Sequence, residues 1–460
     1  MSFTRKSDGR LAAKRGAGGL VSSLAPLVRG REAVWLAAAL SDADREAATS
    51  GMIEAEGFRF RSLAVDVDTF RMFYDVVANS TLWFLYHGLF DLARRPRLDR
   101  HWRKAWDAYR SVNQTFAQAV IDDAPEGAIV LVQDYHFALV GTWLAQKRPD
   151  LRAVHFSHVP FCDPTTMRVL PTDVAVELLV GMTSHLSCGF HSKRWAANFT
   201  ACCSEILGFE PDTFVSPLTP DTEDLARVAA SEECAKELRH LEEQVGTRKL
   251  ILRVDRIELS KNVLRGFWAY DELLELHPEW RGHVVFAALV YPSRDSLPEY
   301  LAYRQEVEAL ARLLNDKWGT LDWTPVIVDT ADNFPHSVAA LRRYDVLLVN
   351  PIRDGLNLVA KEGPLLNERN GVLVLSREAG VWEELGGVAI GINPFDVSGT
   401  ASALAAALSL APDERAKQTE AVRQASRDRS PRDWLDDQIR AAAEHRVGVS
   451  PPLRRQAGAP

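Results

Sequence analysis

The sequence predicts an α/β protein in which parallel strands alternate with helices. In the second half, short apolar and β-branched runs alternate with helical stretches such as 263–276 and 297–314. The expected strands are 250–254, 283–290, 325–329, 345–349 and 372–376. Such alternation indicates a mostly parallel sheet with helices on both faces. A chain of 460 residues, 47% of them hydrophobic, can bury two cores, so we expect two domains.

The first half predicts the same alternation, with a polar beginning at 1–15. Expected strands are 33–39, 58–66, 128–136, 153–161, 185–190 and 213–217, with helices at 69–88 and 192–203. A charged helix at 230–243 follows a proline-rich stretch, which places the domain boundary between 217 and 231. We therefore expect a first domain at 1–222 and a second domain at 223–430. A C-terminal helix at 431–447 should pack back on the first domain, and 448–460 should form a disordered tail.

The composition restricts the partners and the compartment. The formal net charge of -8 argues against a nucleic-acid or polyanionic membrane partner. No apolar run reaches membrane-spanning length, and the first residues lack the apolar core of a signal peptide. Five cysteines without a CxxC pair suit a reduced cytoplasm, with structural thiols. A homo-oligomer is compatible with all of these features.

The stretch 350–367 is typical of a ligand site. It follows the expected strand 345–349, and Asp354-Gly355 reads as a tight turn that opens a helix. Strand ends of this kind bind ligands in open α/β sheets, and the free N–H groups of a helix start attract anions such as a diphosphate. Glu362, one to two turns further on, could accept hydrogen bonds from sugar hydroxyls. An ordinary βα turn with a solvated glutamate is the alternative.

A second loop adds two cations at the same kind of sheet edge. Arg256 and Lys261 follow the strand 250–254 and precede the helix 263–276. Two fixed cations that face a helix N-terminus could neutralise a departing nucleoside diphosphate. Solvated surface charge is the alternative for this pair.

These two loops resemble the donor-site signatures of retaining glycosyltransferase family 20, the trehalose-6-phosphate synthase-like enzymes. The motifs are Val254-Asp-Arg-Ile-Glu-Leu-Ser-Lys-Asn262 and Arg353-Asp-Gly-Leu-Asn-Leu-Val-Ala-Lys-Glu362, and the resemblance extends from Gly16 to about Asp437. It implies two Rossmann-like domains that face each other across a cleft, the GT-B fold. It also implies transfer of a hexose from a nucleotide sugar to a sugar phosphate, with retained configuration and without a protein nucleophile, a cofactor or a metal.

The resemblance also assigns roles to single residues. Arg256 and Lys261 would steady the leaving diphosphate. His158 would bind the donor sugar, and Asp134 would orient the acceptor hydroxyls near the reacting carbon, so all four count as catalytic candidates. Donor contacts would come from Gly19, Asp354, Asn357, Leu358, Val359 and Glu362. Acceptor contacts would come from Tyr74, Trp83, Asp134 and Arg294. Taken without the resemblance, Tyr74 and Trp83 could equally be core residues, His158 a satisfied core histidine, and Arg294 a solvated loop residue.

Two patterns that could suggest a metal site carry little weight. Asp66-Val-Asp68 is a three-residue match that is common by chance, and His155 and His158 have no third ligand at a plausible spacing. We therefore expect no metal site.

Departures from the family concentrate on the acceptor side. The family carries an additional first strand whose arginine helps to hold the acceptor phosphate, and Ser2-Phe3 resembles the residue pair just after it. Either the start at Met1 is misassigned, which we favour, or the protein lacks this strand and one acceptor contact. Ala38 stands where the family has a tryptophan, Gln133 where it has a histidine, and Leu218-Thr219 where it has Gly-Ile. Three hypotheses follow. The first is transfer of glucose to glucose 6-phosphate, the second a pseudo-glycosyltransferase that couples a cyclitol to an aminocyclitol phosphate through a C–N bond, and the third a non-catalytic regulatory homologue.

Overall fold

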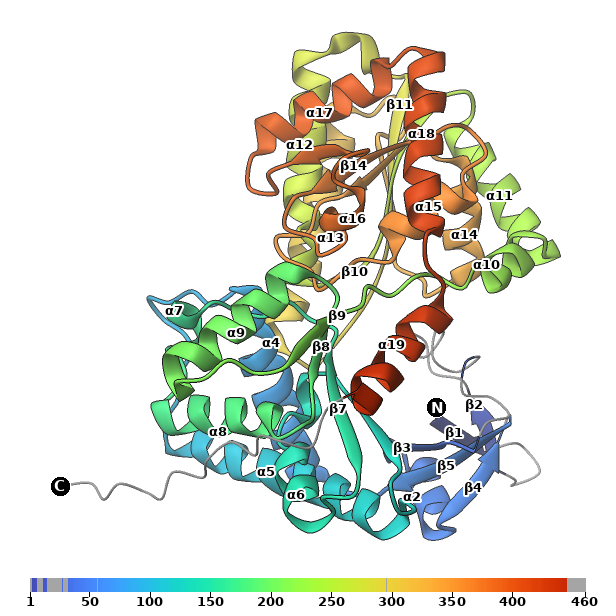
Figure 1. Cartoon of the computed structure of the whole chain (residues 1–460). Helices are drawn as coiled ribbons and strands as arrows, with labels where there is room; N and C mark the ends of the chain where they lie inside the picture. Colours follow the sequence, from blue (N-terminus) through green and yellow to red (C-terminus); the bar gives the residue numbers. More distant parts are fainter. Residues whose placement is uncertain are drawn as a thin grey trace.

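The computed structural model describes residues 2–5, 11–14, 27, 32–55, 57–294 and 296–444. Two lobes lie one above the other, the first built from the N-terminal half and the second from most of the C-terminal half (Figure 1). Gly19, the remainder of the glycine loop and the tail 448–460 lie outside the described residues.

The second lobe contains a six-stranded sheet in the order β12-β11-β10-β13-β14-β15, with every pair parallel. Its strands are β10 Lys249–Arg256, β11 Val284–Tyr291, β12 Val326–Asp329, β13 Val346–Val349, β14 Val372–Ser376 and β15 Ile390–Ile392. The first five match the expected strands, and β15 was not predicted, because three residues carry little periodicity.

Helices cover both faces of this sheet, as the alternation predicted. One face carries α12 Val263–Leu276, α13 Pro298–Trp318 and α17 Val397–Ser409. The other carries α11 Glu232–Val245, α14 Phe334–Arg343, α15 Val359–Leu366 and α18 Pro412–Arg427, with α10 Thr222–Ala229 and α16 Trp382–Leu385 beside them. Alternate residues of β10 enter the two cores: Ile251 packs on the first face, Leu250 and Leu252 on the second.

The first lobe has two separate larger sheets. One is the parallel sheet β6-β7-β8-β9, formed by Ile129–Gln133, Arg152–Ser157, Cys188–Phe190 and Thr213–Val215. The other has the order β3-β5-β4, formed by Val34–Ala38, Phe58–Leu63 and Met52–Ala55. A doubly wound sheet of order 3-2-1-4-5 would place its first strand between β3 and β6. The described residues contain no strand there.

A small hairpin near the start was not predicted. Strands β1 Ser2–Arg5 and β2 Leu11–Lys14 pair antiparallel. We expected no strand in 1–15, because the segment is polar and lacks alternation.

The helices of the first lobe enclose an aromatic core. They are α2 Asp42–Thr49, α3 Val67–Arg71, α4 Trp83–His87, α5 Arg100–Asp123, α6 Val140–Lys147, α7 Pro164–Met167, α8 Thr172–Thr183 and α9 Lys193–Leu207. A π-helical stretch, Met72–Leu82, joins α3 to α4, so the single helix expected at 69–88 is continuous but wider in its middle. It ends at Gly88, whose φ of 65° is a left-handed C-cap.

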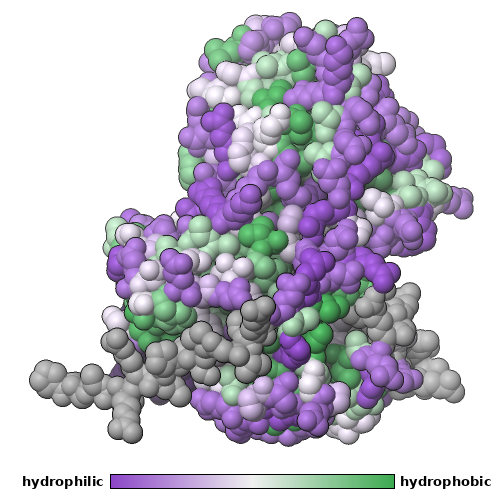
Figure 2. All heavy atoms as spheres, in the orientation of Figure 1, coloured by the Kyte–Doolittle hydropathy of each residue, from purple (hydrophilic) through white to green (hydrophobic). Residues whose placement is uncertain are grey.

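The chain crosses between the lobes twice, after β9 and after α18. The second crossing leads into α19, Pro431–Glu444, which packs against β6 and β7 of the first lobe (Figure 1). Arg152 on β7 donates from Nε to the carbonyl of Ala442 over 2.7 Å. Hydrophilic residues dominate the face shown in Figure 2, with hydrophobic residues in smaller groups. Among the described helices, none is both long and apolar enough to span a membrane.

Candidate active site

The predicted site residues follow the carboxyl ends of parallel strands in both lobes. In the second lobe, Arg256 ends β10, Arg294 follows β11, and Asp354 follows β13. In the first lobe, Asp134 follows β6 and His158 follows β7. Because parallel strands bring these ends to one edge, residues far apart in the sequence share one region of each sheet.

Two loops of the second lobe are joined directly to each other. Lys261 Nζ lies 2.7 Å from Asp354 Oδ2 and 3.6 Å from Asp255 Oδ1. Asn262 Nδ2 donates to the carbonyls of Asn350 (3.0 Å) and Pro394 (2.8 Å). The two motifs recognised in the sequence therefore form one unit.

The charges of this unit stabilise each other. Burial alone would lower the pKa of Lys261, but the carboxylates of Asp354 and Asp255 outweigh it, and the pKa is raised. Burial would likewise raise the pKa of Asp354, but the Lys261 ammonium holds it below its ordinary value. Both groups are thus charged at neutral pH.

Arg253 holds the loop 255–262 through hydrogen bonds, a role that the sequence analysis did not predict. It is fully buried on β10, and its guanidinium donates to Asp255 Oδ2 over 3.0 Å and to the carbonyl of Lys261 over 2.5 Å. The signal in the sequence was a charged residue inside an otherwise apolar strand, because such a residue requires internal partners.

The start of α15 is shaped for an anion. Asn357 has a φ of 87°, and its side chain donates to Asp354 Oδ2 (3.2 Å) and accepts from Ala360 N (3.2 Å). The N–H groups at Leu358 and Val359 open the helix, where the first amides lack intrahelical partners and the dipole favours negative charge. This geometry suits a diphosphate beside Lys261.

Glu362 lies on the first turn of α15. Its side chain is half-buried, and burial raises its pKa to about 7. A carboxyl with this pKa changes charge near neutral pH, so its capacity to accept hydrogen bonds depends on pH.

Gly355 brings the two lobes into backbone contact. A Cβ atom built on it would lie 1.9 Å from the carbonyl oxygen of His158 in the first lobe. Its own carbonyl accepts from Trp195 Nε1 over 3.0 Å, also from the first lobe. Only glycine fits here, which gives the Asp-Gly pair a packing reason beyond its turn.

Arg256 and Arg294 share one buried carboxylate. Glu258 is 1% exposed, and its Oε1 lies 3.0 Å from a guanidinium nitrogen of each arginine. Burial would raise the pKa of Glu258, but the two arginines hold it below its ordinary value. The sequence did not indicate that Glu258 connects Arg256 of the donor side with Arg294 of the acceptor side. A glutamate that lies between Arg256 and Lys261 in the sequence is normally interpreted as a solvated surface residue.

Arg294 rests on aromatic side chains. Its guanidinium centre lies 4.9 Å from the ring centroid of Trp83, and Nη1 donates to the Tyr300 hydroxyl over 2.7 Å. Trp83 is only 2% exposed, so in this structure it belongs to the core and contacts the arginine. Tyr74 is half-buried and stacks on His136 with centroids 5.4 Å apart. Their acceptor roles stay predictions.

Asp134 has an unusual backbone and a perturbed carboxyl. Its φ of 69° and ψ of 170° lie in a region that L residues rarely adopt. Burial raises its pKa to about 6, although Oδ1 accepts from His158 N over 3.1 Å. Strain and a raised pKa together are typical of a functional position.

The ring of His158 is enclosed by protein groups. Its Nδ1 lies 3.1 Å from His191 Nε2, and its Nε2 lies 2.9 Å from Gln133 Oε1. Sequence reasoning proposed that this ring contacts the donor sugar, and it left a satisfied core histidine as the alternative. Both nitrogens have protein partners here, so the donor contact stays a prediction.

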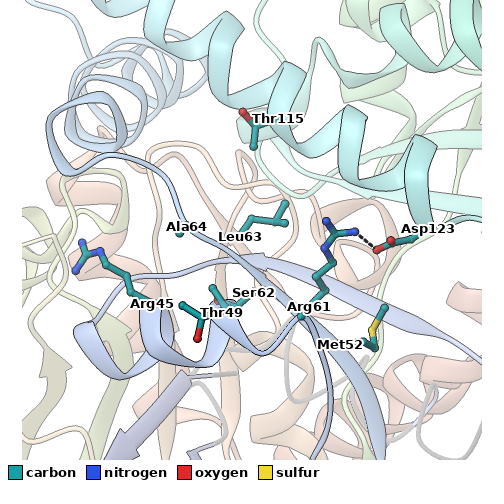
Figure 3. A pocket seen from close by; sticks show the side chains of 11 residues that line it. Arg45, Thr49, Met52, Arg61, Ser62, Leu63, Ala64, Thr115 and Asp123 are labelled. Atoms are coloured by element: carbon teal, nitrogen blue, oxygen red, sulfur yellow. Dashed lines mark ion pairs between the residues drawn. The ribbon is translucent and has the colours of Figure 1, made fainter.

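One cavity of the first lobe lies away from these residues. It has a volume of about 530 Å³ and sits between α2, β5 and α5 (Figure 3). Arg61 and Asp123 in its wall form an ion pair, and no predicted site residue lines it. Its walls offer neither an unpaired cation cluster nor a helix start, so we place the chemistry in the region around Lys261. Ala38, at the end of β3, is half-buried.

Comparison with known proteins identifies the family. A model of glycosyltransferase family 20 matches residues 1–444. A trehalose-6-phosphate synthase of Mycolicibacterium vanbaalenii is 33% identical over 92% of this chain and 90% of its own length. A bifunctional trehalose-6-phosphate synthase/phosphatase of Thermoproteus tenax is 34% identical over 80% of this chain, which spans about half (51%) of that relative.

Solved structures agree over nearly the whole chain. A Burkholderia xenovorans UDP-forming α,α-trehalose-phosphate synthase in complex with glucose-6-phosphate has a TM-score of 0.83 and 26% identity, covering 93% of this chain and 97% of that one. A structure from E. coli bound with UDP-2-fluoro glucose has a TM-score of 0.84 and 26% identity, covering 94% and 97%. The GT-B architecture expected from the sequence is confirmed. The protein is a glycosyltransferase, and the chain belongs to glycosyltransferase family 20.

Proposed function

We propose that this glycosyltransferase moves glucose from UDP-glucose to glucose 6-phosphate and forms trehalose 6-phosphate. The observation that carries the proposal is the joined pair of loops in which Lys261, 2.7 Å from Asp354, lies beside the start of α15. The named substrates of the relatives, a UDP sugar and glucose-6-phosphate, supply the identities. We further propose that the reaction needs no metal and takes place in the cytoplasm.

The donor binds to the second lobe. The diphosphate meets the amides of Leu358 and Val359, and Arg256 and Lys261 neutralise its charge. Asp354 contacts the hexose, and Glu362, when ionised, accepts from the ribose hydroxyls. Arg256 suits this role because 43% of its side chain is exposed and so open to a ligand.

The acceptor binds from the first lobe and meets a cation of the second. Arg294 is bonded to Glu258 and Tyr300 and lies over Trp83, so its guanidinium is oriented before a phosphate arrives. Asp134 lies at the end of β6 and orients the acceptor hydroxyls.

The transfer requires no protein nucleophile. The anomeric hydroxyl oxygen of the acceptor attacks C1 of the glucosyl group from the face that the diphosphate leaves. The bond from C1 to the diphosphate oxygen breaks, and that oxygen takes the acceptor's proton. Arg256 and Lys261 stabilise the charge that develops on the leaving group. Contact between the lobes at Gly355 limits the access of water, which would otherwise hydrolyse the donor.

A second candidate is coupling of a nucleotide-linked cyclitol to an aminocyclitol phosphate. Ala38, Gln133 and Leu218 favour it, because each departs from the family pattern, the first two on the acceptor side and Leu218 at the crossing between the lobes. The retained Arg294 fits a phosphorylated acceptor under either hypothesis.

The test is product formation from UDP-, GDP- and ADP-glucose with glucose 6-phosphate. We expect trehalose 6-phosphate and an equal amount of nucleoside diphosphate, identified by mass spectrometry. Glucose without the phosphate is the control acceptor and should react far more slowly. Nucleotide binding without transfer to glucose 6-phosphate would overturn the proposal and direct the search to aminocyclitol phosphates.

A further inference from the structure

The ring of His158 lies within a continuous row of hydrogen bonds that crosses the first lobe. Five links make up the row, with donor–acceptor distances of 3.3, 3.1, 2.9, 3.0 and 3.4 Å. In order, they join Leu218 N, His191, His158, Gln133, Gln438 and the carbonyl of Trp434.

The first half of the row has a fixed direction. A backbone N–H can only donate, so His191 Nδ1 must accept from Leu218. A neutral imidazole has one N–H, so the proton of His191 is on Nε2, and it donates to His158 Nδ1. The proton of His158 is then on its Nε2.

The second half continues in the same direction. His158 Nε2–H donates to Gln133 Oε1, and the amide nitrogen of Gln133 donates to Gln438 Oε1. The amide nitrogen of Gln438 faces the carbonyl of Trp434, which can only accept. The row thus begins at a backbone N–H, which can only donate, and ends at a backbone carbonyl, which can only accept. Together the two ends assign the tautomers of His191 and His158 and the amide orientations of Gln133 and Gln438.

The row is buried at its ends and half-buried in its middle. Exposure is 3% for Leu218, 4% for His191, and zero for Gln438 and Trp434, whereas His158 and Gln133 are half-buried. An unpaired polar group at the buried ends loses its hydration without compensation. Burial, and after it the neighbouring His191, also lower the pKa of His158, in agreement with a neutral ring.

The two ends of the row coincide with the two crossings between the lobes. Leu218 lies on the crossing after β9, and its carbonyl accepts from Lys361 Nζ of α15 over 3.0 Å. Gln438 lies on α19, after the second crossing. His158 therefore connects, through hydrogen bonds, the helix proposed to bind the diphosphate with the C-terminal helix.

We propose that Gln133 and Gln438 are positioning residues that, together with His191, hold His158 as the neutral Nε2–H tautomer and fix its ring at the carboxyl end of β7, next to the contact between the lobes at Gly355. A glutamine oxygen only accepts and does not titrate, so Gln133 imposes one tautomer, whereas a histidine in its place could donate or accept. The consequence for catalysis rests on the proposed function, but the tautomer does not.

The first experiment reads the tautomer without any substrate. Long-range ¹H–¹⁵N spectra of histidine-labelled protein distinguish a bare ring nitrogen from a protonated one, with His158 assigned from the H158N variant. We expect a bare Nδ1 and a protonated Nε2 at pH 7.5. In Q133M the Leu218 end of the row still directs the His191 proton to His158 Nδ1, but the Nε2–H of His158 loses its acceptor, so its proton resonance should shift upfield and exchange faster with water. A protonated Nδ1 in the native protein, or an unchanged Nε2–H resonance in Q133M, would overturn the proposal.

The second experiment separates positioning from stability. Methionine keeps the length of glutamine without its hydrogen bonds, so Q438M should lower kcat about tenfold, with little change in KM for the acceptor. The double variant Q133M/Q438M should be no worse than Q133M, because both act through one ring. Q424M, at an exposed glutamine of α18, is the matched control. The proposal would be contradicted if the losses of kcat in Q133M and Q438M were additive in the double variant. It would also be contradicted if Q438M and Q424M lost kcat equally. If no donor supports transfer, the spectra alone still decide the tautomer.

Discussion

The donor and acceptor sides of this molecule are built in different ways. The described part of the proposed donor side consists of two short loops of one sheet and the helix α15 that follows the second loop, and the two loops are joined by the ion pair between Lys261 and Asp354. The proposed acceptor side draws on the helical segment that carries Tyr74 and Trp83, on the end of β6 at Asp134, and on a residue from the opposite lobe, Arg294, which lies over Trp83. The difference teaches that a site made of local loops can be recognised from motifs, whereas a site assembled by packing cannot.

The departures from the family follow the same division. The two donor motifs are intact, whereas Ala38, Gln133 and Leu218 all belong to the acceptor side or the crossing next to it. Gln133 and Leu218 lie on the same hydrogen-bonded row, although 85 positions separate them in the sequence, from 133 to 218. Changes that look independent in the sequence are thus connected in the structure.

The largest effect should come from the donor side. Lys261→Ala should lower kcat/KM about a thousandfold, or about 4 kcal/mol, because it removes a fixed cation from the leaving diphosphate and leaves Asp354 without its partner. Steady-state kinetics with UDP-glucose and glucose 6-phosphate measure this. Lys317→Ala, which breaks a surface pair with Asp271, should leave the rate unchanged. A loss below tenfold would remove Lys261 from the charge-stabilising role.

The acceptor side should respond through KM. Arg294→Ala should raise the KM for glucose 6-phosphate about a hundredfold, while the affinity for UDP stays within a few fold, because the guanidinium is held for a phosphate of the acceptor. Arg294→Lys should recover only part of this, since an ammonium does not form a planar fork. Isothermal titration with UDP provides the second measurement, and Arg304→Ala on α13 is the surface control. Equal losses for both ligands would mean that the two sides are not separate.

The buried carboxyl of Asp134 should lower the stability of the folded protein at high pH, and this effect can be measured. Its pKa, about 6 in the folded protein, is above the ordinary value of 3.8, so the native state binds its proton more tightly than the unfolded chain does. The stability from this group is full below about pH 4 and is lost as the pH rises through about 6. At pH 8 the ionised carboxyl costs about 2 kcal/mol, after allowing for partial exposure.

Asp134→Asn should therefore raise the melting temperature at pH 8 and lower activity. Asp150→Asn is the opposite control, because Arg148 holds the pKa of Asp150 below its ordinary value and its loss should destabilise at pH 8. Thermal denaturation at pH 5 and pH 8 tests both. If Asp134→Asn lowered the melting temperature at pH 8, the ionised carboxylate would not destabilise the folded state, and the prediction would be wrong.

The smallest expected effect is a pH dependence of UDP binding, which tests whether Glu362 contacts the ribose. Because the pKa of Glu362 is about 7, the affinity for UDP should fall about severalfold as the pH decreases below 7, since a protonated carboxyl still accepts a hydrogen bond but without the gain from its charge. Titration of the UDP phosphate contributes to both proteins, so the difference between the native protein and Glu362→Gln isolates the carboxyl. Parallel pH profiles for the two would place Glu362 outside the ribose contact.

Much of the fold could be predicted because it depends on local patterns. The run 249–256 has a strand pattern, and 263–276 a helical one, and both form as expected. Elements without such a pattern were missed: β15 has three residues, α10 merges with the charged helix after it, and the polar hairpin β1–β2 lacks alternation.

By itself, the sequence determined the α/β class and singled out the two loops that meet at Lys261 and Asp354, because those depend on periodicity and on residues within a few positions of each other. Only the tertiary structure decided that Glu258 joins two arginines, that Trp83 is covered by Arg294, and that the ring of His158 lies between His191 and Gln133. Each of these depends on the distance between atoms from separate strands or helices. Packing sets that distance, and no spacing along the chain encodes it.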